Sequence, residues 1–582
     1  MLTEFGEKLD KSCPLAEYPR PQLVRSSYLN LNGEWECEFS RSAEIPAKFG
    51  TKILVPFSPE TPLSGIGRVL APNEYLHYKK VFFVPADFNK GRILIHFGAV
   101  DQIAEVYVNG KKAGTHIGGY TPFTVHATEF IKPGEDNTII VSVKDYSDTK
   151  QYSKGKQKFK RGGIWYSPQS GIWQTVWMES VPHDYIEKLR ITPDIDREEV
   201  RFEYSGTGDL PVTAAVYDGD TLIAETTDKV VKLPDCKLWS PEHPFLYNVV
   251  FTAGKDRVKS YFGMRKFSVG TDENGIKRLF LNNKPYFHNG LLDQGYYPDG
   301  FLTPPSNAAM ENDVKAVKNM GFNMLRKHIK IEPLLWYHYC DVNGIIVWQD
   351  MVNGGGSYGA EISVLPFIGI NLDDHNYKTF KRTDAEQREN YYIELADMID
   401  ELYNCPCIAV WVPFNEGWGQ FDSANAYNFI KNMDSTRIVD SASGWHDRGV
   451  TDVISKHIYF TPIKVKAGDK PYVLSEYGGF SQRISGHTFN NKMFGYKIYK
   501  SKKGLTAAYK RLFEKVIIPQ IKTGLSAAVY TQVTDVEDEL NGLLTYDRKV
   551  QKIDNNVLKE INERVKSVSY THLRAHETRG NL

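Results

Sequence analysis

The sequence predicts a multidomain protein of class β plus α/β: a jelly-roll β-sandwich, an immunoglobulin-like β-sandwich and then a (β/α)8 TIM barrel. Three observations support this fold class. The chain has 582 residues, enough for several domains. Short β-prone runs between turn signals fill roughly the first 270 residues, with no helical periodicity. From about residue 274 onward, apolar strand-like runs alternate with helical patterns, as in a barrel of βα units.

The first β-rich region covers residues 1–182. Its β-prone runs lie at 77–84, 92–97, 104–108 and 138–143. Asn109-Gly110 indicates a hairpin turn, because both central positions of such a turn need positive φ. The pattern predicts a sandwich or jelly roll. The strand pattern does not distinguish a domain that supports the rest of the chain from one that contacts a sugar.

The second β-rich region covers residues 183–270. It contains a proline-punctuated loop at 238–247 and ends with the β-prone run 261–267. Its length suits a single immunoglobulin-like sandwich. No residue pattern in this region indicates chemistry of its own.

The third region, residues 274–566, is expected to form the barrel. Helical patterns such as 306–320 and 384–402 separate most of its strand candidates. A long glycine-rich insert at 354–374 follows the third strand and is expected to lie over the mouth of the barrel. The eight strand candidates are 286–292, 324–328, 345–348, 408–413, 438–441, 453–458, 472–474 and 527–531.

Two glutamates follow apolar strands where a barrel holds its active site. Glu416 lies in the segment 409–420, AVWVPFNEGWGQ, after strand four, and Glu476 lies in the segment 473–479, VLSEYGG, after strand seven. Barrel active sites are built at the carboxyl ends of the strands. A glycosidase needs two carboxyl groups across the bond that it cleaves. Either glutamate alone is explained by a solvated strand end, but the repeated pattern favours catalysis.

Composition excludes several function classes. The 71 basic and 71 acidic residues balance, so neither nucleic acid nor an anionic membrane is expected as a partner. No run of about 18 apolar residues indicates a membrane span, and residues 1–21 lack the apolar core of a signal peptide. The six cysteines are scattered, and Cys405-Pro-Cys407 is too close for an ordinary disulfide and a poor zinc candidate. We therefore expect a reduced, cytoplasmic protein.

The last residues, 567–582, differ in character from the rest. The segment 568–578, VSYTHLRAHET, resembles an in-frame translation of a transposon-type sequencing adapter. We expect this tail to be non-native and the native sequence to stop after about Lys566. His572 and His576 are therefore excluded as metal ligands.

The chain resembles glycoside hydrolase family 2, which contains β-galactosidases, β-glucuronidases and β-mannosidases, over nearly its whole length. Each motif alone is weak, but their order and spacing across three domains carry the resemblance. The motifs are LNGEW (31–35), VPFS (55–58), YVNG (107–110), HIGGYTPF (116–123), GIWYSPQSGIW (163–173), LWSP (238–241), YFGMR (261–265), NMLRKH (323–328), NE (415–416) and SEYG (475–478).

The resemblance implies a retaining double-displacement mechanism. Carried over to this sequence, Glu416 would be the acid/base, Glu476 the nucleophile and Asn415 the donor to the sugar 2-hydroxyl. Neighbouring carboxylates push each other's pKa values apart, which keeps one protonated while the other is ionised. A cofactor is not expected, and no metal is expected because the magnesium ligands of the large β-galactosidases have no match here.

Further candidates follow the other strands, and each has a structural alternative as a hydrogen-bonding or packing residue in the barrel mouth. Arg326 and His328 end strand two, and His457 and Tyr459 end strand six, where relatives contact the sugar; Tyr459 is also a candidate donor to the nucleophile. Asp293 and Gln294 after strand one, and Asp350 after strand three, are candidates to bind sugar hydroxyls, and Trp418 and Trp445 are candidates to stack on the sugar ring. Asp535 and Glu537 follow strand eight and are equally explained as solvated or as functional residues.

The sugar is predicted to be a terminal neutral one, most simply a β-galactoside. The β-glucuronidase subgroup has an Asn-x-Lys motif whose lysine meets the sugar carboxylate, whereas this chain has Asn541-Gly-Leu543. Leucine cannot pair with a carboxylate, which disfavours a glucuronide. Alternatives are a β-mannoside, an α-L-arabinoside, a β-galacturonide or a non-catalytic carbohydrate-binding protein. A homo-oligomer is compatible with the resemblance.

Overall fold

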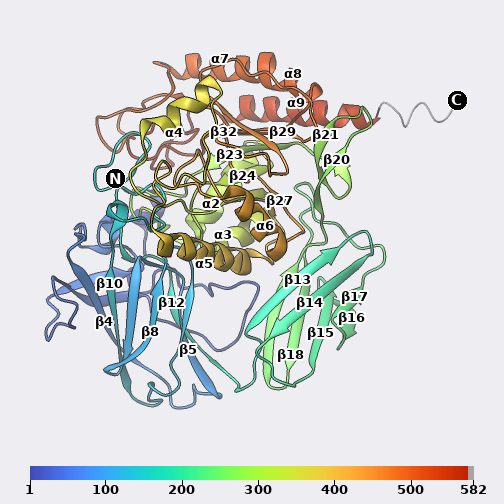
Figure 1. Cartoon of the computed structure of the whole chain (residues 1–582). Helices are drawn as coiled ribbons and strands as arrows, with labels where there is room; N and C mark the ends of the chain where they lie inside the picture. Colours follow the sequence, from blue (N-terminus) through green and yellow to red (C-terminus); the bar gives the residue numbers. More distant parts are fainter. Residues whose placement is uncertain (575–582) are drawn as a thin grey trace.

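The computed structural model describes residues 1–574 and confirms the predicted fold class. Two β-sandwiches lie side by side beneath a barrel of parallel strands, the first drawn in blue and the second in green (Figure 1). In the described part of the chain, no helix has both the length and the apolar composition of a membrane span. All six cysteines are free thiols.

The first sandwich packs a six-stranded sheet, ordered β3-β2-β4-β10-β7-β8, against a four-stranded sheet, ordered β1-β12-β5-β9. Asn109 and Gly110 both adopt positive φ in the hairpin between β7 and β8, as predicted. The core lies between the two sheets. The strands are β1 (Leu29–Asn30), β2 (Gly33–Ser40), β3 (Thr51–Val55), β4 (Tyr75–Phe83), β5 (Arg92–Phe97), β6 (Val100–Asp101), β7 (Ile103–Val108), β8 (Lys111–Ile117), β9 (Phe123–His126), β10 (Asp136–Lys144), β11 (Gly171–Ile172) and β12 (Val176–Val181).

The second sandwich packs the sheet β13-β14-β17 against the sheet β16-β15-β18-β19, and a small sheet, β20-β21-β22, leads from it into the barrel. Its strands alternate buried and exposed residues, as expected for sheets with one face on a core. The strands are β13 (Lys188–Asp194), β14 (Glu199–Ser205), β15 (Val212–Asp218), β16 (Thr221–Thr226), β17 (Val230–Lys232), β18 (Tyr247–Ala253), β19 (Asp256–Phe262), β20 (Phe267–Thr271), β21 (Lys277–Leu281) and β22 (Lys284–Pro285).

The barrel sheet has the strand order β27-β26-β25-β24-β23-β32-β29-β28, all parallel. In the described residues no ladder joins β27 to β28; a hydrogen bond from Asp452 N to Val439 O (3.0 Å) spans that seam. Strand seven is longer than predicted, because its pairing continues beyond Leu474 and includes Glu476. The strands are β23 (His288–Asp293), β24 (Met324–Lys327), β25 (Ile346–Asp350), β26 (Ile408–Val412), β27 (Ile438–Val439), β28 (Ile454–Ile458), β29 (Tyr472–Gly478) and β32 (Leu525–Thr531).

The two helices expected from periodicity form with side-chain caps. Ser306 caps α2 by accepting from Ala309 N, and Asp384 caps α5 by accepting from Gln387 N. No helix follows β27 or β28 directly, so the βα alternation is incomplete there. The helices of the barrel region are α2 (Asn307–Asn319), α3 (Leu334–Asn343), α4 (Ala360–Val364), α5 (Ala385–Leu402), α6 (Ser423–Met433), α7 (Lys502–Leu512), α8 (Ile518–Lys522) and α9 (Asn555–Arg574).

The C-terminal helix α9 packs beside α7 and α8 (Figure 1). The helix ends at Arg574 and so continues past Lys566, the residue after which the native sequence was expected to stop. Val568 contacts the barrel core. The rest of the predicted adapter-derived tail, including His576, lies outside the described residues.

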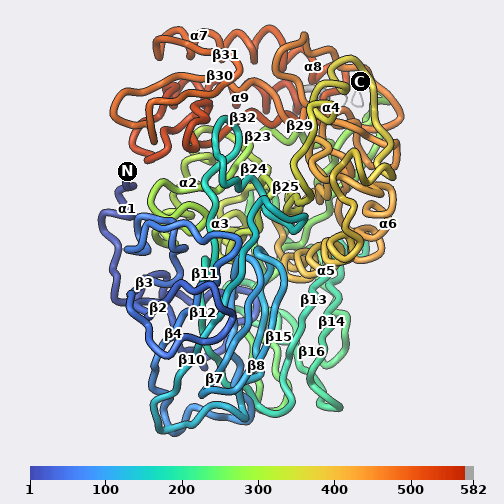
Figure 2. The backbone as a smooth tube through the Cα atoms, turned by 60° about the vertical axis from the view of Figure 1, so that its left-hand side comes forward, coloured from blue at the N-terminus to red at the C-terminus, as the bar shows by residue number. Residues whose placement is uncertain are grey.

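One segment of the first sandwich extends onto the barrel. Figure 2 shows this blue-green segment, residues 145–170, rising from the sandwich towards the ends of β24, β25 and β32. Lys154 N donates to Asn353 O (2.9 Å) beyond β25, and the Tyr166 hydroxyl donates to Glu539 (2.6 Å) beyond β32. The first sandwich therefore contributes to the mouth of the barrel, and we call residues 151–170 the barrel-facing segment.

Candidate active site

Glu416 is presented by a tight turn at the end of β26. Its φ is 51°, in the left-handed region that costs a non-glycine residue free energy. A hydrogen bond from Glu416 N to Ser443 O (3.0 Å) holds this conformation. Gly417 follows with φ 70°, and a Cβ there would lie 2.6 Å from His446. The turn is thus built to direct one carboxyl group into the barrel.

Glu476 lies inside β29, and both of its carboxylate oxygens are held. Arg326 Nη1 donates to Oε1 (3.3 Å), and the Tyr459 hydroxyl donates to Oε2 (2.5 Å). The carboxylate is therefore oriented by partners from β24 and from the end of β28. The hydrogen bond from Tyr459 is the donation to Glu476 expected of it, while sugar contact by Arg326 and Tyr459 stays a prediction.

The two glutamates face each other across His457. One carboxylate oxygen of each glutamate and one ring nitrogen of His457 all lie within 4.8 Å of one another. His457 Nδ1 is 2.7 Å from Glu416 Oε1. Retaining glycosidases hold their carboxyl groups about 5–5.5 Å apart, and inverting ones about 6.5–9.5 Å apart. The nearest oxygens of the two glutamates lie closer together than the inverting separation.

The surroundings give the two carboxyl groups opposite pKa shifts. Burial by itself would raise the pKa of Glu476, but four neighbours lower it to about 2: His457, His328, Arg326 and Tyr459. Burial holds the pKa of His328 well below its ordinary value, so Arg326 is the permanent positive charge beside Glu476. For Glu416, burial is the largest effect and raises the pKa above 4.5, against the hydrogen bond with His457. The pair thus favours one ionised and one protonated carboxyl group.

Asp350 positions Arg326 rather than offering a free oxygen. The guanidinium donates to both Asp350 oxygens, Nε to Oδ1 (2.9 Å) and Nη2 to Oδ2 (3.0 Å). His328 Nδ1 also lies 2.9 Å from Asp350 Oδ2. Because Asp350 is fully buried and engaged by both, its predicted contact with sugar hydroxyls is replaced by a role in orienting Arg326.

Asn415 keeps a hydrogen-bond donor free. Its Oδ1 accepts from Arg326 Nη2 (2.8 Å), which fixes the orientation of the amide. Its Nδ2 is buried and has no partner among the described residues. A buried donor without a partner costs free energy, and a ligand hydroxyl at that place would satisfy it.

Asp293 and Gln294 are not gathered with the glutamates. The Asp293 carboxylate pairs with Lys327 Nζ (2.6 Å), and Gln294 Nε2 donates to Gln532 Oε1 (2.8 Å). Successive residues of a strand point to opposite faces, so Lys327 points away from the side that Arg326 occupies. The sequence could not tell which residue after strand one faces the site.

Asp535 and Glu537 are buried, so the solvated alternative considered for them is wrong. Asp535 pairs with Lys552 Nζ (2.6 Å). Glu537 accepts from Ser167 N (2.9 Å) of the barrel-facing segment. Both residues therefore have structural partners, and Glu537 helps to hold that segment.

The two candidate tryptophans differ in accessibility. Trp418 is only 4% exposed and packs against the ring of Trp165, with centroids 5.0 Å apart. Trp445 is half-buried, and its ring lies 6.3 Å from His457 and 5.7 Å from Phe367. Phe367 belongs to the insert after strand three, which was expected to be a loop and also contains the short helix α4. Trp445 therefore keeps more accessible surface for a ligand than Trp418 does.

Lys156 is a residue near the site that the sequence did not single out as a candidate. It lies on the barrel-facing segment, is 4% exposed, and its ammonium is 5.7 Å from the centre of the Trp418 ring. Its charge opposes the rise that burial causes in the pKa of Glu416. The available signal was the basic run 154–161, KGKQKFKR, directly before the motif GIWYSPQSGIW.

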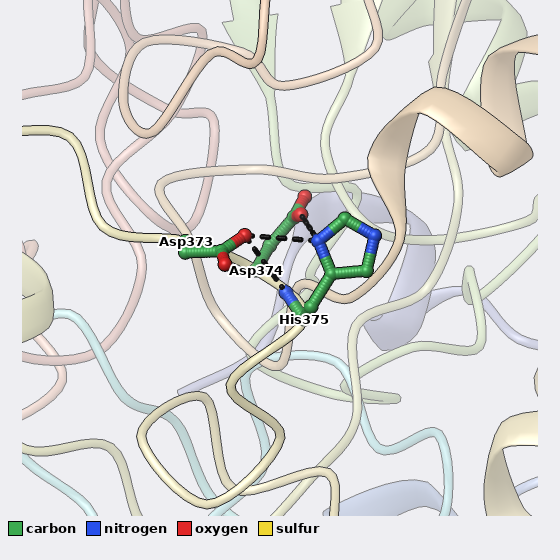
Figure 3. A group of neighbouring side chains, drawn as sticks. All are labelled: Asp373, Asp374 and His375. Carbon is green, nitrogen blue, oxygen red and sulfur yellow. Dashed lines mark hydrogen bonds and ion pairs between the residues drawn. The ribbon is translucent and has the colours of Figure 1, made fainter.

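A second cluster of carboxylate and imidazole groups lies in the insert after strand three. Figure 3 shows Asp373 and Asp374 both directed towards the His375 ring. Asp374 Oδ2 already accepts from Ser423 N (3.0 Å) and Ser423 Oγ (2.5 Å) at the start of α6. His375 and Asp373 are largely exposed and pair with each other at 2.9 Å. This cluster anchors the insert to α6, and we assign it a structural role.

Comparisons with known proteins agree with this architecture. The chain matches "Glycosyl hydrolases family 2, sugar binding domain" over residues 26–175, "Glycosyl hydrolases family 2" over 185–265, and "Glycosyl hydrolases family 2, TIM barrel domain" over 277–567. These three matches follow one another along the chain in the order sugar-binding domain, middle domain and barrel domain.

Among curated relatives, the chain is 27% identical over 463 residues to a putative β-glucuronidase of Formosa agariphila, covering 71% of this chain and 51% of the relative. It is 24% identical over 450 residues to a β-galactosidase of Priestia megaterium, covering 70% and 41%. The chain thus spans about half the length of these relatives. The β-D-glucuronidase structure of Dictyoglomus thermophilum superposes with a TM-score of 0.75 at 18% identity, covering 94% and 98% of the two chains. The barrel-domain match spans half of the chain, and this protein belongs to glycosyl hydrolase family 2.

Proposed function

We propose that this protein is a retaining exo-β-glycosidase in which Glu476 is the nucleophile and Glu416 is the acid/base. The observation that carries this proposal is the pair itself: carboxylate oxygens within 4.8 Å, with opposite pKa shifts. The ionised carboxylate is suited to attack carbon, and the protonated carboxyl group is suited to donate a proton.

The reaction proceeds in two displacements. Glu476 attacks the anomeric carbon, the bond to the leaving oxygen breaks, and Glu416 transfers its proton to that oxygen. Water then attacks the same carbon, Glu416 takes the proton of the water, and Glu476 is released. Asn415 Nδ2 donates to the 2-hydroxyl, a bond that strengthens in the oxocarbenium-like transition state and lowers the barrier.

The burial of the site supports action on a chain end. Glu416 is 7% exposed and Glu476 is 5% exposed, so both carboxyl groups are recessed within the barrel. The barrel-facing segment and the insert after strand three both lie at the mouth. A terminal sugar fits such a site better than the middle of a polysaccharide does.

The favoured substrate is a β-glucuronide, with a β-galactoside as the second candidate. Relatives and superposable structures include several β-glucuronidases, together with β-galactosidases. The leucine at position 543 is the residue that disfavours a glucuronide. Leu543 is buried in the apolar barrel core, so a cation for the sugar carboxylate would have to come from another part of the chain.

A panel of 4-nitrophenyl glycosides tests this proposal: β-glucuronide, β-galactoside, β-mannoside, β-glucoside, α-L-arabinoside and β-galacturonide. We expect the highest kcat/KM on the β-glucuronide. Proton NMR during the reaction should show the β-anomer of the sugar as the first product. An α-anomer formed first would contradict the double displacement. Sugar binding without hydrolysis on the whole panel would instead support a carbohydrate-binding protein.

Replacing Tyr459 with phenylalanine should lower kcat by about 10- to 100-fold, because a hydrogen bond to a charged group is lost. The hydroxyl donates to Glu476 Oε2 and stabilises the ionised form. Its loss raises the pKa of Glu476, and since the ionised form is needed, the acidic limb of the pH–rate profile should move to higher pH.

The control for this variant is Tyr377→Phe, which removes a tyrosine–carboxylate hydrogen bond to Asp422 (2.9 Å) elsewhere in the barrel. Its pH–rate profile should match that of the wild type. An acidic limb that stays in place in Tyr459→Phe would show that the hydroxyl does not stabilise the reacting carboxylate.

A further inference from the structure

We propose that Lys156, a residue of the first sandwich, binds the carboxylate of a uronic acid sugar in the barrel and so selects charged over neutral sugars. The inference rests on the proposed function and assigns its substrate class to a single side chain. It places the specificity determinant outside the barrel, on the barrel-facing segment.

The position of the Lys156 ammonium is fixed by two aromatic rings. It lies 5.4 Å from the centre of the Tyr166 ring and 5.7 Å from that of Trp418. Trp418 is two residues beyond Glu416, and its ring is 6.2 Å from His328. The ammonium therefore lies on the Trp418 side of the site, near the turn that carries Glu416.

Electrostatics supports the same position. Burial raises the pKa of Glu416, and the Lys156 charge is one of the effects that oppose the rise. Burial lowers the pKa of His328, and the Lys156 charge lowers it further. In a pyranoside, the carbon that bears the carboxylate is separated from the anomeric carbon by the ring oxygen alone. When the anomeric carbon lies at the two glutamates, the sugar carboxylate is therefore close enough to interact with the Lys156 charge.

Lys156 has no anionic partner of its own. Among the described residues its ammonium makes no hydrogen bond and no ion pair, although the side chain is 4% exposed. Ring faces attract a cation, but they do not replace acceptors for its three N–H groups. Lysine is almost never this buried without a partner. A carboxylate from the substrate would provide the missing charge and the missing acceptors.

Two other cations on the same segment, Lys154 and Arg161, are already engaged. Lys154 Nζ donates to Gly355 O (2.5 Å), and Arg161 pairs with Glu537 (3.1 Å) and Asp538 (3.0 Å). These contacts attach the segment to the barrel on both sides of Lys156. The backbone at Lys156 is also fixed, because its carbonyl accepts from Tyr166 N (2.9 Å). Lys156 is therefore presented from a rigid support.

The test compares matched substrates that differ only in the charged group. The ratio of kcat/KM for 4-nitrophenyl β-D-glucuronide to that for the β-D-glucoside is measured for wild type and Lys156→Met. Loss of one partner of a buried charge pair should lower this ratio by about 100-fold. Lys160→Met, which removes an exposed lysine of the same segment, should keep the wild-type ratio. Lys156→Gln is the second variant if the methionine variant fails to fold by circular dichroism.

A binding measurement separates this inference from the proposed function. Calorimetry with the Glu476→Gln protein should show glucuronate binding at least about tenfold more tightly than glucose, and Lys156→Met should abolish that preference. If wild type hydrolyses no glycoside, the proposed function fails, and this preference alone still decides the role of Lys156. An unchanged ratio, or equal affinity for the two sugars before mutation, would overturn the inference.

Discussion

Replacing Glu476 with glutamine is expected to lower kcat by about 10⁴-fold or more, the scale seen when a covalent nucleophile is removed. The amide has nearly the same shape but cannot form a glycosyl ester. The fold should persist, because Arg326 keeps its paired contact with Asp350. Kinetics on the best panel substrate, with a thermal melt by circular dichroism, measures both effects.

The control is Glu389→Gln, the same change at an exposed glutamate on α5. It should keep wild-type kcat. The role of Glu476 is also tested by stereochemistry. In Glu476→Ala, azide can occupy the space of the missing carboxylate and attack the substrate directly, which inverts the anomeric carbon. An α-glycosyl azide is therefore expected; a β-azide from this variant would reassign the nucleophile.

Much of the fold was predictable because its determinants are local. Asn109-Gly110 requires positive φ, and Ser306 and Asp384 supply helix caps, so short stretches of sequence indicate a turn and two helix starts. Apolar runs indicate the barrel strands in the same way. Strand seven was underestimated since its apolar run stops at Leu474, whereas its extent depends on pairing with β28 and β32.

The site was less predictable, because its chemistry depends on which strands become neighbours. Glu416 and Glu476 could be found as polar residues after buried strands. Whether Asp350 faces a sugar or Arg326 depends on side-chain orientation across two strands, which the pattern does not contain. Lys156 could not be connected to Glu416 at all, since the two residues belong to different domains and meet only when the barrel-facing segment docks. The position of Lys156 relative to Glu416 is set by long-range packing and not by local propensity.

Glu416 should show its role through the leaving group. In Glu416→Ala, kcat/KM on substrates with poor leaving groups is expected to fall by about 10²–10⁴-fold, the usual contribution of general acid catalysis. A dinitrophenyl leaving group needs no proton, so formation of the glycosyl-enzyme should be nearly as fast as in wild type. The intermediate should then accumulate, visible as a burst of dinitrophenolate and a lowered KM. Azide should release it as a β-glycosyl azide.

The pH dependence tests the same assignment independently. Burial raises the pKa of Glu416 above its ordinary 4.5, while the pKa of Glu476 is lowered to about 2. Catalysis needs Glu416 protonated and Glu476 ionised, so activity should fall as pH rises through the pKa of Glu416. In Glu416→Ala the group that must be protonated is gone, and the alkaline limb should disappear for the dinitrophenyl substrate. An alkaline limb that persisted unchanged would show that another residue is the acid. His457 would then be the first residue to replace, because its Nδ1 is 2.7 Å from Glu416.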